Sequence, residues 1–126
     1  MRTKIDIGRR AEGRAARHLR QHGYRILEQN FKNKLGEIDI VAKDKDVICF
    51  VEVRSRRGLR EHQEVLASVD GRKQRRLSTM AVSFLKQRRL LEQKARFDIV
   101  SVIFDQDRED IRLLKDAFPL CSRYSF

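Results

Sequence analysis

The chain has 126 residues, 40% of them hydrophobic, so it is long enough for one domain with a buried core and too apolar for wholesale disorder. Its 29 Lys and Arg residues outnumber its 18 Asp and Glu residues, and the resulting charge of +11 favours a polyanionic partner, nucleic acid or an acidic membrane surface. No apolar run suits a signal peptide or a membrane span, so we expect a cytoplasmic protein that does not enter a membrane.

The first expected element is an amphipathic helix over residues 7–22. Apolar residues recur every four positions from Ala11 to Leu19, and Gly23 follows as a C-cap. At about 100° per residue, Glu12 falls inside this apolar stripe, whereas five arginines fall on the remaining arc. The sequence therefore makes Glu12 a candidate functional acid, and pairing with a neighbouring arginine explains it equally well.

Three strands are expected next. The segments YRIL (24–27), EIDIVA (37–42) and VICFVEVR (47–54) are rich in β-branched and aromatic residues. Between the last two, KDKD (43–46) indicates a hairpin turn. The pattern predicts an antiparallel hairpin in the middle of the fold.

The second half of the chain also contains both helical and strand segments. Residues 58–71 indicate a loop with a short helix, and Asp70 is the expected N-cap of a second amphipathic helix that ends near Arg89. Residues 96–104 indicate a buried strand, and residues 110–118 either an edge strand or a short helix. This order of elements predicts an α/β fold.

The strand EIDIVA carries two acids. If its side chains alternate regularly, Glu37, Asp39 and Val41 lie on one face, and Ile38 and Ile40 lie on the other. Glu37 stands at the start of the strand, which favours a salt bridge or hydrogen bond over a ligand role.

A second acid occupies the strand VICFVEVR, where Glu52 and Arg54 share the polar end of one face. A hairpin about KDKD brings Glu52 close enough to Asp39 to share a ligand. Two carboxylates in a partly desolvated place repel each other, so either a cation lies between them or basic side chains such as Arg54 and Arg56 pair with them. From the residues alone both solutions stay open. Mg²⁺ prefers carboxylate oxygens together with waters and phosphate.

Residues 8–56, 73–85 and 96–100 resemble the YraN-type family of uncharacterised bacterial proteins, and the combination of GEIDIVA (36–42) with FVEVR (50–54) is the most specific part of the match. That family is placed in the restriction-endonuclease-like superfamily, whose active site follows a PD-(D/E)xK pattern and which includes the Holliday-junction resolvases. The resemblance implies a restriction-endonuclease-like core, with a mixed central β-sheet flanked by α-helices.

The length of the chain predicts a single restriction-endonuclease-like domain over residues 1–126. The motif-bearing core spans about 8–104, and residues 105–126 form a C-terminal extension. Branched-DNA relatives act as dimers, which makes a homodimer worth testing.

The resemblance also implies that Glu12, Asp39 and Glu52 are metal ligands. We expect the metal to be Mg²⁺ or Mn²⁺, and the Val53 carbonyl to complete its shell. Arg54 stands where the pattern has a lysine. A lysine there can orient or help to deprotonate the attacking water, whereas arginine, with a pKa above about 12, cannot act as a base. Arg54 can still hold the scissile phosphate or stabilise transition-state charge.

Basic residues on both sides of these acids are expected to contact nucleic acid. A phosphate at the start of the second long helix would satisfy both backbone amides and side chains. A solvated charged face explains any single one of these residues at least as well. The full set of expected contacts is Arg56, Arg57, Arg60, Lys73, Gln74, Arg75 and Arg76.

Other chemistries find little support. The three histidines lack zinc spacing, no Ser-His-Asp order is discernible, and no glycine-rich phosphate loop occurs, which disfavours metal-free nucleophilic hydrolysis and ATP-driven reactions. Cys49 and Cys121 lie far apart and are expected to be reduced thiols.

The sequence favours a Mg²⁺- or Mn²⁺-dependent nuclease whose substrate is nucleic acid, with DNA favoured and branched or single-stranded forms included. The alternative is a weakly active or inactive nucleic-acid-binding module that keeps the nuclease fold. A third reading is a basic interaction domain that docks on a larger DNA-processing protein.

Overall fold

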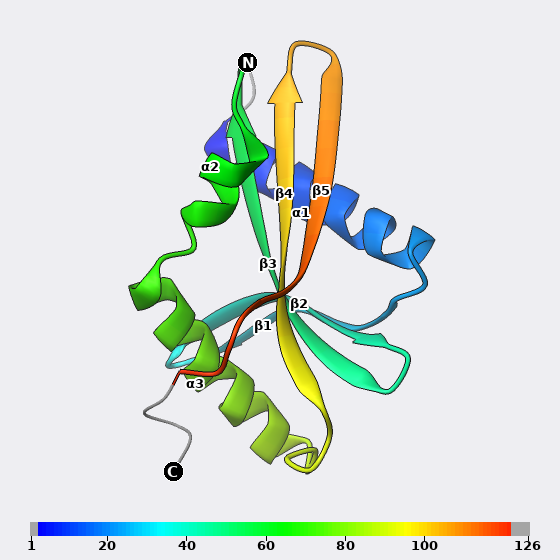
Figure 1. The fold of residues 1–126 in the computed structure, drawn as a ribbon, viewed down its shortest axis with the longest axis vertical. Helices are drawn as coiled ribbons and strands as arrows, with labels where there is room; N and C mark the ends of the chain where they lie inside the picture. Colours follow the sequence, from blue (N-terminus) through cyan, green and yellow to red (C-terminus); the bar gives the residue numbers. More distant parts are fainter. Residues whose placement is uncertain (1–2, 122–126) are drawn as a thin grey trace.

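The computed structural model describes residues 3–121 and shows one five-stranded sheet between helices (Figure 1). The strand order is β1-β2-β3-β4-β5, and neighbours are antiparallel except for the parallel pair β3 and β4. This confirms the expected mixed α/β fold and matches a restriction-endonuclease-like core. The elements are α1 (Lys4–Gln21), β1 (Arg25–Asn33), β2 (Gly36–Asp44), β3 (Val47–Arg57), α2 (His62–Ala67), α3 (Gly71–Gln87), β4 (Ala95–Asp105) and β5 (Arg108–Phe118).

The helix boundaries follow from capping side chains. Helix α1 begins three residues earlier than expected because Thr3 and Asp6 form a reciprocal capping box, in which each side chain accepts a backbone N–H of the other. Gly23, with φ of +87°, follows the helix in the left-handed conformation expected there. Helix α3 begins after Asp70, whose Oδ1 accepts the Lys73 N–H at 3.0 Å, as the sequence predicts.

The two edge strands are mostly polar, which limits what the sequence can say about them. Strand β1 runs on to Asn33, well beyond the expected segment 24–27, because most of its residues face solvent and give no apolar signal. At the opposite edge, β5 pairs antiparallel with β4, from Arg108 opposite Asp105 to Phe118 opposite Phe97. The expected C-terminal extension therefore contributes a full strand to the sheet.

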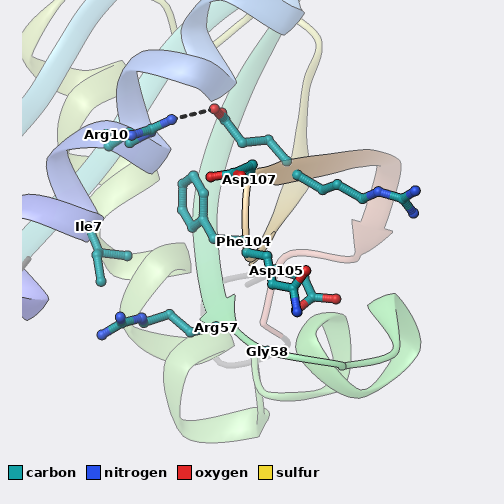
Figure 2. A pocket seen from close by; sticks show the side chains of 10 residues that line it. Ile7, Arg10, Arg57, Gly58, Phe104, Asp105 and Asp107 are labelled. Atoms are coloured by element: carbon teal, nitrogen blue, oxygen red, sulfur yellow. Dashed lines mark hydrogen bonds and ion pairs between the residues drawn. The ribbon is translucent and has the colours of Figure 1, made fainter.

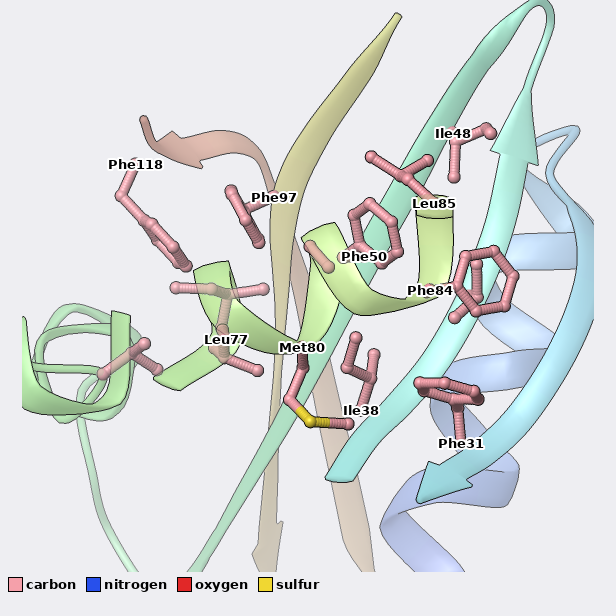
Figure 3. Close-up of a cluster of buried hydrophobic side chains, with 14 residues drawn as sticks. Phe31, Ile38, Ile48, Phe50, Leu77, Met80, Phe84, Leu85, Phe97 and Phe118 are labelled. Atoms are coloured by element: carbon pink, nitrogen blue, oxygen red, sulfur yellow. The ribbon is translucent and has the colours of Figure 1, made fainter. Parts of the chain in front are cut away.

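Each face of the sheet has its own hydrophobic cluster. On one face the small residues of α1 let the helix pack closely against the strands, and its buried members are Ala11, Ala15, Ala16 and Leu19. On the other face α3 packs through Leu77, Met80, Ala81, Phe84 and Leu85 (Figure 3). The Phe84 ring meets Phe31 and Phe50 edge to face, at centroid distances of 5.1 and 5.7 Å. The two helices thus hold the central hairpin of β2 and β3 from opposite sides.

The expectation that Ile38 and Ile40 share a face is wrong. Ile38 packs in the α3 cluster, whereas Ile40 packs in the α1 cluster. Regular alternation breaks at Asp39, where the pairing of β2 with β3 ends and β2 continues only against β1. A two-stranded ribbon twists more strongly than a broad sheet, and Asn30 in β1 adopts a positive φ of 55° in this same stretch. Figure 1 shows β1 and β2 running across the direction of β4.

Candidate metal and nucleic-acid site

The candidate site lies where β2 separates from β3. The last paired residues are Ile40 and Val51, so Asp39 and Glu52 are the next residues along the two diverging strands. The Val53 N–H donates to Asp39 Oδ2 at 2.8 Å, which gives this amide a side-chain acceptor in place of a strand partner. Strand β3 continues beside β4 as far as Arg57. Strands β2 and β3 thus form a fork that begins at Asp39 and Glu52, and this fork holds the Asp39 carboxyl group in a fixed position.

Asp39 and Glu52 are neighbours within this fork, close enough for the charge of Glu52 to act on the Asp39 carboxyl group. Glu52 is only 4% exposed, and burial together with the neighbouring Glu52 charge raises the pKa of Asp39 to about 9. The fork therefore favours the neutral form of the Asp39 carboxyl group. The sequence expectation that the hairpin brings these two acids together agrees with the structure.

Two cations pair with Glu52. Lys73 Nζ lies 3.3 Å from Glu52 Oε2, and Arg54 Nε lies 3.6 Å from the same oxygen. Arg54 also points Nη2 at the Ser68 carbonyl, at 3.4 Å. The position of Lys73 is a surprise, because its place in the α3 sequence indicated a phosphate contact at the helix surface.

Glu12 and Glu37 extend the acidic group on the other side of Asp39. One carboxylate oxygen from each of Glu12, Glu37 and Asp39 lies within 4.8 Å of the others. Burial raises the pKa of Glu12, and the nearby Glu37 and Glu52 raise it further. Glu12 Oε1 is buried without a hydrogen-bond partner, and a buried carboxylate oxygen without a partner is costly.

This donor set fits a hard divalent cation. It consists of carboxylate oxygens from α1 and β2, the ligand type that Mg²⁺ and Mn²⁺ prefer, and a cation there would satisfy the buried Glu12 oxygen. Sequence reasoning had treated Glu37 as a salt-bridge partner. It does pair with Lys32 at 3.3 Å, yet it also belongs to the acidic group. The sequence signal for this second role is the spacing of two residues between Glu37 and Asp39.

A cavity of about 550 Å³ opens beside these acids. Glu12 and Glu37 lie in its wall together with Arg9, Asn30 and Lys32. Acidic groups that can hold a metal therefore stand next to cations that can hold a phosphate. Val53 contributes its N–H to Asp39, and its carbonyl remains an expected ligand.

The other expected nucleic-acid contacts are more dispersed. Gln74 donates Nε2 to the Val69 carbonyl at 3.0 Å, so this side chain fixes the link between α2 and α3. Arg75 and Arg76 are exposed on the first turns of α3. Arg56 is half-buried and donates to the Ser55 carbonyl at 2.7 Å.

Arg57 and Arg60 lie beyond the fork. Arg60 pairs with Glu64 of α2 at 3.5 Å and is otherwise exposed. Arg57 lines a separate cavity of about 470 Å³, between the start of α1 and the hairpin of β4 and β5 (Figure 2). None of the expected metal ligands lines that cavity, and Arg10 there already pairs with Glu109 at 2.6 Å. The cavity beside Glu12 fits the expected chemistry better.

The structure does contain a Ser-His-Asp contact that the sequence order did not reveal. His62 Nδ1 lies 2.7 Å from Ser101 Oγ, and His62 Nε2 lies 2.9 Å from Asp110 Oδ2. Ser101 has no exposed surface, so its hydroxyl cannot attack a substrate. The contact ties α2 to β4 and β5, and it gives no support to a serine-nucleophile mechanism.

Comparison with known proteins identifies the family. The model of the uncharacterised protein family UPF0102 matches residues 11–102. The chain belongs to the UPF0102 family. A UPF0102 protein of Syntrophus aciditrophicus is 44% identical over 95% of this chain and 94% of its own length, and one of Clostridium kluyveri is 40% identical over 91% and 95%. The family match covers every expected metal ligand, and the relatives' names state no activity.

Strand β5 lies outside the UPF0102 match, whereas the fork, α3 and the part of α1 from Ala11 onward lie inside it. Among residues 3–121, no helix combines the length and the apolar character that a membrane span requires.

Proposed function

We propose that this UPF0102 protein is a Mg²⁺- or Mn²⁺-dependent nuclease that hydrolyses phosphodiester bonds, with DNA as the favoured nucleic acid. The observation that carries the proposal is the meeting of four acids at the fork between β2 and β3. Carboxylate oxygens of Glu12, Glu37 and Asp39 lie within 4.8 Å of one another, and Glu52 follows the last residue of β3 that pairs with β2, beside Asp39. A chain with a charge of +11 that concentrates acids at one point is suited to holding a metal against a polyanion.

Asp39 and Glu52 would hold the metal, with Glu12, Glu37 and the Val53 carbonyl as further ligands. When bound, the metal neutralises charge on the phosphodiester and lowers the pKa of water. The Val53 N–H fixes Asp39 Oδ2, and Asp39 would bind the metal as the deprotonated carboxylate.

The basic residues of the fork act on the phosphate. Arg54 and Lys73, both beside Glu52, provide positive charge where negative charge develops in the transition state. Arginines and lysines farther away supply affinity that does not depend on sequence, so binding should fall steeply as salt rises.

A second candidate function is nucleic-acid binding without catalysis. The observation in its favour is that Arg54 replaces lysine and that two cations already neutralise Glu52. Such a module would bind DNA equally well with and without a divalent metal.

The two functions are separated by assaying DNA binding and cleavage with and without Mn²⁺. Plasmid, single-stranded and branched DNA should be compared, using the wild type, Glu52→Gln and the exposed control Asp46→Asn. The nuclease proposal predicts that Mn²⁺ strengthens DNA binding and permits cleavage, that Glu52→Gln loses both effects, and that Asp46→Asn keeps them. DNA binding that is identical with and without Mn²⁺ in both wild type and Glu52→Gln would favour the binding module.

A further inference from the structure

Lys73 and Arg54 reach the same carboxylate oxygen from different elements. Arg54 extends from β3 and Lys73 from the first turn of α3, and both end on Glu52 Oε2, at 3.6 and 3.3 Å. Glu52 itself is almost completely buried. A divalent cation on Glu52 would therefore meet two positive side chains that are already in place.

The two cations differ in the number of protein groups that they contact. Arg54 Nε lies 3.6 Å from Glu52 without a hydrogen bond, and Nη2 donates to the Ser68 carbonyl at 3.4 Å, so the guanidinium contacts two protein groups. The Lys73 ammonium has three donor hydrogens on a flexible stem, and Glu52 is its ion-pair partner among residues 3–121. Lys73 is therefore the cation that can change partner at the lower cost.

The backbone of Lys73 keeps its side chain near the fork. Its N–H is capped by Asp70 at 3.0 Å, and its side chain is only 26% exposed, whereas the neighbouring Arg72 and Arg75 are exposed. The side chain is thus mostly covered by protein, and its ammonium lies 3.3 Å from Glu52 Oε2. A small movement would take the ammonium from Glu52 to an anion bound beside it.

Like charges on one carboxylate repel each other, so a metal bound by Glu52 would push the Lys73 ammonium away. The phosphodiester of the substrate is the anion best placed to receive it. We propose that Lys73 is a positioning residue that exchanges Glu52 for a substrate phosphate when a divalent cation binds, so that metal and phosphate reinforce each other's binding. This inference rests on the nuclease function proposed above, and it gives Lys73 a role distinct from that of a general surface contact.

The test is calorimetric titration of Mn²⁺ into the wild type, Lys73→Met and the exposed control Arg72→Met. Each protein is titrated alone and with a short oligothymidylate that carries phosphorothioate linkages. Without the oligonucleotide, Lys73→Met should bind Mn²⁺ about five- to tenfold more tightly than the wild type, because a like charge has been removed. The oligonucleotide should raise the Mn²⁺ affinity of the wild type at least about fivefold and that of Lys73→Met less than about twofold.

Arg72→Met removes the same charge one residue away and should behave like the wild type. Mn²⁺ binding by Lys73→Met that is weaker than, or equal to, that of the wild type would overturn the exchange, as would an unchanged effect of the oligonucleotide. In those cases the Glu52→Gln result still decides the nuclease proposal. Absence of Mn²⁺ binding in the wild type would overturn both.

Discussion

Two five-residue segments of this chain have similar sequences, but their aspartates lie in opposite electrostatic surroundings. EIDIV (37–41) lies in β2 and RFDIV (96–100) in β4, and each places an aspartate inside the sheet. Asp98 is completely buried, yet it accepts hydrogen bonds from Tyr24 at 2.8 Å, Arg96 at 3.0 Å and the Asp116 N–H at 2.9 Å. Asp39 faces acids.

The residue two positions before each aspartate makes the difference. Arg96 turns its guanidinium onto Asp98 and also reaches Asp44 at 2.7 Å, so the Asp98 charge is matched within the protein. Glu37 adds a third carboxylate beside Asp39 instead, and its own cation, Lys32, is exposed. A buried acid surrounded by donors stabilises the fold, whereas a buried acid among acids is a place for a cation.

Substitution of the two aspartates by asparagine should give opposite results, and the larger effect belongs to Asp98. An asparagine can accept through only one of its two terminal atoms, so Asp98→Asn would direct N–H groups at existing donors. We expect a loss of about 3 kcal/mol in the free energy of unfolding, the usual cost of breaking a buried ion pair. Urea denaturation measures this loss. An Asp98→Asn protein as stable as the wild type would show that the donors around Asp98 are not essential.

Asp39→Asn should instead remove a loss of stability that the wild type undergoes as the pH rises. Its amide oxygen can accept the Val53 N–H, and the neutral amide adds no charge beside Glu52. The folded-state pKa of about 9 lies above the ordinary 3.8, so stability from the neutral carboxyl is complete below about pH 4 and is lost as pH rises towards 9. Within this window the free energy of unfolding of the wild type should fall with rising pH relative to that of Asp39→Asn.

Urea unfolding of both proteins at several pH values measures that difference, and Asp46→Asn, in the exposed hairpin turn, should follow the wild type. Parallel pH profiles for wild type and Asp39→Asn would mean that Asp39 is ionised in the folded protein at neutral pH.

The smallest expected effect is that of Glu12→Gln. The substitution removes a partly buried charge whose Oε1 lacks a hydrogen-bond partner, so the fold should be no less stable. Mn²⁺ affinity should fall about tenfold, because one carboxylate is lost from the ligand group. Calorimetry beside the exposed control Glu61→Gln checks this. Unchanged Mn²⁺ affinity in Glu12→Gln would remove Glu12 from the ligand set.

The sequence predicted those features that depend on neighbours along the chain. The apolar period of α1, the Asp70 cap and the hairpin between β2 and β3 are local, and together they brought Asp39 beside Glu52. Glu12 joined them because its place in the apolar stripe directs it towards the sheet.

The missing features depend on distant packing. The twist that separates Ile38 from Ile40 arises only once β2 leaves β3, and the contact of Lys73 with Glu52 depends on how α3 lies over the sheet. Ser101 and His62 are 39 residues apart, so no short motif could have joined them. EIDIV and RFDIV could not be separated by pattern, since their difference lies in which partners the fold brings to each aspartate.

The central claim, that the acids of the fork bind a divalent metal, is tested most directly by titrating Mn²⁺ into the wild type, Asp39→Asn and Asp46→Asn in a calorimeter. Circular dichroism first establishes that all three are folded. We predict that the wild type and Asp46→Asn bind Mn²⁺ and that Asp39→Asn does not. Equal binding by Asp39→Asn, or no binding by the wild type at millimolar Mn²⁺ with DNA present, would contradict the claim.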